Sequence, residues 1–174
     1  MIVDTLEYNG KQYMRYKSNW VDSNNMVVHL ELQDILNNLF IERIDLSGTE
    51  IQEIIMQASK FKESGSYKLA IKYYEYVIEN STENAIRFVL PQITSCYRKY
   101  NEPQKAIDTV SLLKQKYGGG ILTHSLLTSL AAAYCDMEEF GKAKKCCDRA
   151  YAMNNGSSSL ELAMVYKRID ASQK

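Results

Sequence analysis

Histidines and cysteines are the side chains in this sequence whose types could support metal binding or thiol chemistry. They are His29, His124, Cys96, Cys135, Cys146 and Cys147. A zinc site or a reactive thiol cluster would draw on Cys135, Cys146 and Cys147, with His124 as a further ligand. The spacing disfavours both, because the sequence has no Cys-x-x-Cys pair and adjacent cysteines point about 100° apart on a helix. We therefore expect small buried hydrophobic side chains, with no metal and no cofactor, and keep a thiol- or zinc-dependent sensor or enzyme as an alternative.

Motifs of the common enzyme classes are absent from the sequence. It contains no glycine-rich phosphate loop, no serine-centred nucleophile elbow and no zinc-binding His-Glu helix motif. The three consecutive glycines at 118–120 follow a predicted helix rather than a strand, so we expect a flexible linker there. His29 lies at a predicted junction of β and helical structure and His124 opens a predicted helix, which favours structural roles for both. The sequence thus predicts a protein that is not an enzyme.

Composition indicates a helical protein with no net charge. The chain has 174 residues, enough for one domain or for one domain with a small attachment. It has 21 basic and 21 acidic residues, which disfavours binding to nucleic acid or to a membrane surface. Seven acidic and four basic residues precede Gly48, which gives −3 before it and +3 after it and would help the two parts dock. Eight Gly and two Pro are too few for a chain of many short strands.

The first segment is the only part with a β pattern. Residues 2–8 and 11–17 flank Asn9-Gly10, a pair that favours a two-residue hairpin turn. The turn sets the register and predicts three opposite pairs: Leu6 with Tyr13, Asp4 with Arg15, and Val3 with Tyr16. A second turn signal at 22–25 precedes a further apolar run, so we expect an antiparallel meander of three or four short strands, too small to fold alone.

A helix is predicted after the meander, from about Leu30 to Asp45, because apolar residues there repeat at helical spacing. It should cover the meander or join it to the second part of the chain. Gly48 ends this segment, and Thr49 with Gln52 forms a capping-box pattern that opens the next helix. We therefore divide the chain into residues 1–48, an N-terminal cap or small accessory module, and residues 49–174.

The second part repeats itself three times. In each copy a large apolar residue is followed at +3 and +4 by a medium and a small residue, at +7 by an aromatic residue, and at +16 by alanine. The sets are Ile54, Gln57, Ala58, Phe61 and Ala70; Leu90, Ile93, Thr94, Tyr97 and Ala106; and Leu127, Leu130, Ala131, Tyr134 and Ala143. This pattern predicts two antiparallel helices per copy, joined by turns at 64–66, 101–103 and 136–139. Pro103 suits a first helical turn, whereas Pro91 should kink the first helix of the second copy or delay its start.

These positions resemble the tetratricopeptide repeat family, whose unit is a helix-turn-helix with this order of large, small, aromatic and alanine residues. The resemblance places three units at about 51–84, 87–120 and 124–157. It implies a mostly α fold, in which helical hairpins form a right-handed solenoid. Leu162, Val165, Tyr166 and Ile169 repeat the helical stripe once more and predict a capping helix at 158–171.

In this family the first helices of successive units line a concave groove that binds peptides or protein segments. By register, the partner-binding groove would contain Gln52, Ile55, Ser59, Lys62, Phe88, Gln92, Ser95, Arg98, Lys99, Ser125, Thr128, Ser129, Ala132 and Cys135. Hydroxyl and amide side chains suit hydrogen bonding to an extended backbone, and Lys62, Arg98 and Lys99 could attract an acidic residue. The basic and Asn residues with which some relatives hold a terminal carboxylate are not reproduced at the matching positions.

The resemblance implies a non-catalytic adaptor that binds another protein or a peptide. A self-associating structural subunit is a further alternative, with the groove filled by its own N-terminal segment or by another copy. The first residues lack the basic start and apolar stretch of a signal peptide, so we expect a cytoplasmic protein with reduced cysteines. The partner and the oligomeric state are left open by the sequence.

Overall fold

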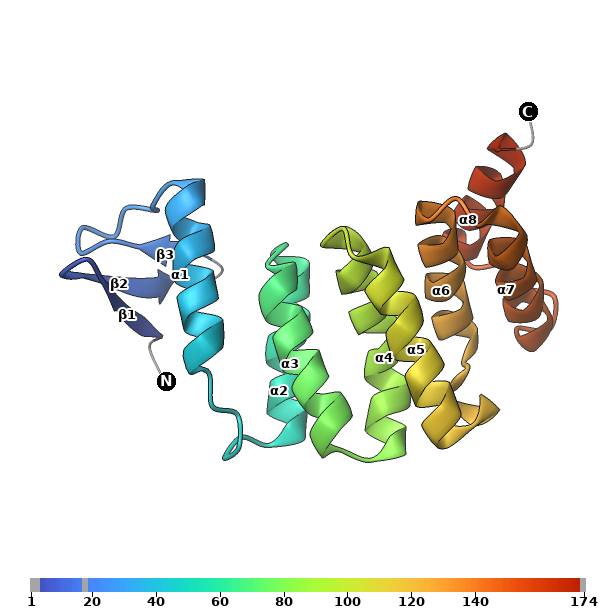
Figure 1. Ribbon diagram of the computed structural model, residues 1–174, viewed down its shortest axis with the longest axis horizontal. Helices are drawn as coiled ribbons and strands as arrows, with labels where there is room; N and C mark the ends of the chain where they lie inside the picture. The colour runs from blue at the N-terminus through green and yellow to red at the C-terminus, as the bar shows by residue number, and fades with distance from the viewer. Residues whose placement is uncertain (1–3, 17–18, 173–174) are drawn as a thin grey trace.

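The computed structural model describes residues 4–16 and 19–172, which form a small sheet followed by eight α-helices (Figure 1). The strands are β1 (Thr5–Tyr8), β2 (Lys11–Tyr16) and β3 (Asn19–Val21). The helices are α1 (Leu30–Arg43), α2 (Ile51–Glu63), α3 (Tyr67–Asn80), α4 (Glu83–Lys99), α5 (Pro103–Tyr117), the 3-10 helix η1 (Gly119–Ile121), α6 (His124–Asp136), α7 (Phe140–Met153) and α8 (Leu160–Ala171). None of the helices in these described ranges is long and apolar enough to cross a membrane.

The sheet is an antiparallel meander in the order β1-β2-β3. Asn9 and Gly10 have φ of 50° and 71°, the positive values that a type I′ turn requires at both positions. The turn pairs Leu6 with Tyr13, as predicted, and the Arg15 N–H donates to the Asp4 carbonyl at 2.8 Å. The predicted pair of Val3 with Tyr16 lies outside the described residues.

Helix α1 covers one face of this sheet. The Gln33 side chain on α1 bonds the backbone of Trp20 in β3 twice: its Oε1 accepts from the Trp20 N–H at 2.7 Å, and its Nε2 donates to the Trp20 carbonyl at 2.9 Å. Trp20 is fully buried, and its indole N–H donates to Asn37 Oδ1 at 2.9 Å. These bonds satisfy the polar groups that the packing buries. We call the sheet together with α1 the N-terminal module.

Arg15 links the N-terminal module to the repeat helices. Its guanidinium carbon lies 4.4 Å from the ring centroid of Phe61 in α2 and 5.5 Å from that of Phe40 in α1. The three guanidinium nitrogens are buried and have no hydrogen-bond partner among the described residues. Burial lowers the pKa of Arg15, and the charge of Asp4 acts in the opposite direction. Contact with aromatic faces therefore replaces hydrogen bonding for this cation.

The remaining helices pack in sequential pairs, α2 with α3, α4 with α5, and α6 with α7. The alanines predicted to mark close crossings, Ala70, Ala106 and Ala143, are all fully buried. The predicted turns lie between the paired helices, and Pro103 is in the first turn of α5. The mostly α fold and the segmentation into hairpins are thus confirmed. Figure 1 shows the N-terminal module at one end of the row of helices and α8 at the other.

Two local predictions were wrong, and one of two alternatives given for a third is excluded. Thr49 does not cap α2, because its N–H still closes a turn on the Leu46 carbonyl and the cap falls on Glu50, which makes no side-chain cap bond. Residues 118–120 do not form a flexible linker, since part of this stretch enters η1 and is anchored by the fully buried Ile121. Of the two effects predicted for Pro91, the delayed start is excluded, because α4 starts at Glu83 and Pro91 lies inside the helix; the kink stays a prediction.

The predicted C-terminal helix is present as α8, which packs against α6 and α7. Ser159 accepts a hydrogen bond from the Leu162 N–H through its side chain and so caps the helix at its N-terminus. Leu162, Val165 and Ile169 are buried, as their spacing predicted. Helix α8 therefore closes the hydrophobic core at the C-terminal end.

Candidate functional site

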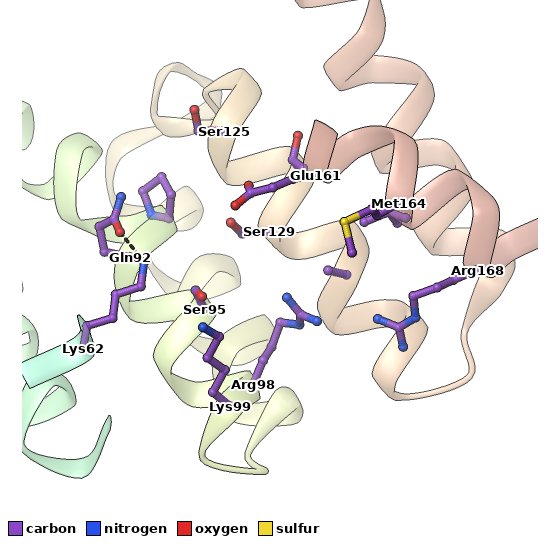
Figure 2. Close-up of a pocket in the computed structure, with 14 residues that line it drawn as sticks. Lys62, Gln92, Ser95, Arg98, Lys99, Ser125, Ser129, Glu161, Met164 and Arg168 are labelled. Atoms are coloured by element: carbon purple, nitrogen blue, oxygen red, sulfur yellow. Dashed lines mark hydrogen bonds between the residues drawn. The ribbon is translucent and has the colours of Figure 1, made fainter. Parts of the chain in front are cut away.

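A hollow of about 380 Å³ lies between α4, α6 and α8, with Lys62 of α2 at its side (Figure 2). We call it the groove. Its lining residues are Lys62, Pro91, Gln92, Ser95, Arg98, Lys99, Ser125, Thr128, Ser129, Ala132, Glu161, Met164, Val165 and Arg168. Hydroxyl, amide and charged side chains make up most of these residues, but polar and apolar atoms contribute about equally to the surface, so it offers both hydrogen-bonding groups and apolar contacts.

Helical spacing places these side chains on one surface. On α4, Gln92, Ser95 and Lys99 are three or four residues apart and share a face, while Leu90 and Ile93 on the opposite side are fully buried. Short turns make neighbouring helices antiparallel, so α2, α4, α6 and α8 all run in the same direction. The groove is thus carried by rigid helices rather than by loops.

Most of the residues predicted for the partner-binding groove line this hollow. They are Lys62, Gln92, Ser95, Arg98, Lys99, Ser125, Thr128, Ser129 and Ala132. Thr128 is almost completely buried and its Oγ1 donates to the His124 carbonyl at 3.1 Å, so its hydroxyl hydrogen is not available to a ligand. The structure therefore brings the predicted residues of the second and third units together, along with Lys62 from the first.

Five predicted residues lie elsewhere. Ile55 is only 8% exposed and belongs to the main hydrophobic core. Ser59 is within 3.2 Å of the Tyr74 hydroxyl, and Gln52 is exposed on α2 outside the hollow. Phe88 is 63% exposed on α4, one turn before the hollow begins, and Cys135 is buried. Of the residues predicted for the groove on α2, only Lys62 lines this hollow.

Helix α8 supplies a wall of the groove that sequence reasoning missed, through Glu161, Met164, Val165 and Arg168. A signal for it was present. Leu162 lies 35 residues after Leu127, close to the spacing of the sequence repeats, so this spacing indicates that α8 lies beside α6 as α6 lies beside α4. The sequence predicted α8 as a capping helix but did not predict that α8 also lines the groove.

A shared carboxylate ties three helices together at one edge of the groove. Asp136 at the end of α6 accepts from Arg98 Nε of α4 at 2.6 Å and from an Arg168 terminal nitrogen of α8 at 2.8 Å. All three side chains are partly shielded from solvent, with 23%, 25% and 44% exposed for Arg98, Asp136 and Arg168. This network fixes the directions of both guanidinium groups.

The two lysines of the groove are held differently. Lys62 Nζ donates to Gln92 Oε1 at 2.5 Å, which joins α2 to α4 across the groove. Lys99 Nζ lies 5.4 Å from the ring centroid of Tyr67. Neither ammonium group has a carboxylate partner among the described residues. Their charges are therefore available to an acceptor from outside.

A second hollow of about 800 Å³ adjoins the same edge. Arg98, Lys99 and Arg168 line both hollows, and Asp136 and the buried Cys135 line the second. Burial raises the pKa of the Cys135 thiol, so it is protonated at neutral pH. Arg98, Lys99 and Arg168 thus lie between two adjoining concave surfaces.

The thiol and zinc alternative gains no support from the geometry. Burial raises the pKa of Cys96 to about 11 and that of Cys147 to about 12, and it also raises the pKa of Cys146. No group of three or more His, Cys, Asp or Glu side chains in the described ranges could hold a metal ion. His29 accepts the Leu32 N–H through Nδ1 at 3.4 Å, a helix-capping role. These residues lack the activated thiolates and the converging ligands that such a site requires.

Comparisons of the chain with protein-family models, with curated proteins and with solved structures gave no match in any of the three.

Proposed function

We propose that this protein is a non-catalytic adaptor that binds a peptide or protein segment of a partner in the groove, without a cofactor. The observation that carries this proposal is the groove itself, a surface lined by hydroxyl, amide and charged side chains from four different helices. Ser95, Ser129 and Gln92 can bond the backbone groups of an extended segment. Rigid helices hold these groups before binding, which reduces the entropy lost on association.

The proposed architecture is a right-handed, tetratricopeptide-like solenoid, with α2–α7 as three repeats. Packing of the helices in sequential pairs supports it, as do the buried alanines Ala70, Ala106 and Ala143 at equivalent places. In such a solenoid the first helix of each hairpin faces the concave side. The lining of the groove by α4, α6 and α8 agrees with that arrangement.

A blocking substitution tests the function. Ser95 is half-buried in the middle of the groove, so Ser95→Trp should fill the hollow without removing a buried contact. We expect the intact chain to enrich peptides from a random display library and the Ser95→Trp variant to enrich none of them. Gln115→Trp, at an exposed position of α5 outside the groove, is the matched control and should behave as the intact chain does.

Failure of this test would have a clear meaning. If Ser95→Trp and Gln115→Trp enrich the same peptides as the intact chain, the groove is not the binding surface and the proposal is wrong. Circular dichroism of both variants establishes that their helical content is unchanged.

Self-association is the second candidate, favoured by the opposite formal charges of residues 1–47 and 48–174. In the structure the N-terminal module lies at the far end of the row of helices from α8, so it does not fill the groove of its own chain (Figure 1). Another copy would have to do so. Sedimentation of the intact chain and of Ser95→Trp distinguishes this case, because the variant would then be monomeric while the intact chain is not.

A further inference from the structure

Charged side chains are concentrated in the groove. One carboxylate lines it, from Glu161, together with four cations: Lys62, Arg98, Lys99 and Arg168. Including Asp136, which binds both arginines, the groove has an excess of two positive formal charges. The whole chain has equal numbers of acidic and basic residues. The excess is therefore a local property of this surface.

The cations share one edge. Lys62 lies in the last turn of α2, Arg98 and Lys99 in that of α4, and Arg168 in that of α8. Glu161 lies in the first turn of α8, and Figure 2 shows it near Ser129, on the side of the groove away from Arg98 and Lys99. Because these helices run in the same direction, the groove has a cationic edge and an opposite edge with a carboxylate.

The lysines are the cations best placed to bind a ligand. The charges of Arg98 and Arg168 are partly neutralised by Asp136, whereas Lys62 bonds only a neutral amide and Lys99 lies near an aromatic ring. An ammonium group has three donors, so each lysine retains donors for a carboxylate oxygen. Lys99 also borders the second hollow, so a segment that extends beyond the groove passes over it.

We propose that the partner segment is acidic: its side-chain carboxylates bind Lys62 and Lys99, its middle part crosses Ser95 and Ser129, and a basic residue of the segment faces Glu161. This inference rests on the proposed function, because it names the chemistry of the segment that the groove binds. Charge complementarity across the groove would fix the orientation of the segment and exclude basic segments from the lysine edge.

The experiment compares charge variants of the full chain on a random peptide display library. Lys99→Glu reverses one cation of the groove, and Lys72→Glu makes the same change at an exposed position of α3 outside both hollows. We expect acidic residues to be enriched by the intact chain and by Lys72→Glu, and to be lost with Lys99→Glu. An acidic peptide selected by the intact chain should bind Lys99→Glu roughly tenfold more weakly.

Each outcome tests either the adaptor function or the acidic chemistry of the partner segment. Peptides enriched without acidic bias, yet lost with Ser95→Trp, would leave the adaptor function standing and overturn the acidic partner. Equal weakening by Lys72→Glu and Lys99→Glu would also overturn it, because overall charge would then explain the effect. If the intact chain enriches no peptide, both proposals fail. Should Lys99→Glu lose helical content, Lys99→Gln takes its place, with a smaller loss expected.

Discussion

Burial sets the behaviour of the individual cysteines in this protein. The ordinary thiol pKa is 9.0, and burial raises it to about 11 for Cys96 and about 12 for Cys147. A pKa two units higher reduces the thiolate fraction at neutral pH about a hundredfold, so these thiols are poor nucleophiles and poor metal ligands. The sequence predicted this burial because Cys147 falls at a packing position of its repeat.

The raised thiol pKa values predict how stability depends on alkaline pH. The unfolded chain releases its thiol protons near the ordinary pKa, whereas the folded chain keeps them to a higher pH. The stabilisation is therefore fully present below about pH 8 and is lost as the pH rises through 9 towards the folded-state values. Urea unfolding at a series of pH values should show this fall, and a shallower fall for Cys147→Ala. Equal slopes for the variant and the intact chain would contradict the assignment.

Single residues also show why the groove was only partly predictable. The positions on α4 and α6 follow from helical periodicity, which is local and can therefore be recognised in the sequence. Ile55 was placed in the groove by the same periodicity but is buried in the main hydrophobic core, to which Leu46 of the preceding linker also belongs. This core joins residues from many elements, and no spacing rule within α2 encodes which of its faces the core covers.

Among the elements, α8 is held by its buried apolar face and also by a shared ion pair. Asp136 accepts from Arg98 and Arg168, so one carboxylate holds α4, α6 and α8 at the cationic edge. The periodic stripe of α8 was enough to predict a helix and its buried face. Its place in the groove depends on α8 packing parallel to α6, which the stripe does not encode; only the 35-residue spacing from Leu127 to Leu162 indicates it.

Removing that carboxylate should loosen α8 more than the rest of the molecule. We expect Asp136→Asn to lower the free energy of unfolding by about 1 kcal/mol, since the partly exposed pairs are weak individually but two arginines lose their partner. Hydrogen exchange should accelerate in α8 and remain unchanged in α2 and α3. The control is Lys142 of α7, which pairs with Glu139 just before this helix. Lys142→Met removes an exposed local ion pair and should leave hydrogen exchange in α8 unchanged. Uniform acceleration across all helices would contradict this role of Asp136.

For the whole molecule, the question is whether the N-terminal module unfolds with the repeats. A sheet of three short strands with one helix is too small to be stable alone. It contacts the repeats through Arg15 on Phe61 and through Phe40, which is packed against both hydrophobic clusters. The module should therefore depend on the repeats for its stability.

Trp20 makes this dependence measurable, since it is the single tryptophan of the chain and is fully buried in the module. Fluorescence of Trp20 reports the module, and far-ultraviolet circular dichroism reports mainly the helices. We expect the two signals to give the same midpoint in urea unfolding, as in a cooperative transition. A fluorescence transition at lower urea concentration would show that the module opens separately.

Packing of helices in sequential pairs has a consequence for how fast the chain reaches its native state. Most contacts in the repeats join residues of the same or the next hairpin, so little loop-closure entropy is lost before they form. Any of the three hairpins can serve as the nucleus from which neighbouring helices add. The contact between Arg15 and Phe61 spans a longer stretch of chain, and it forms only when β2 and α2 are both in place. We therefore expect the N-terminal module to dock late in folding, after the helical hairpins have packed against one another.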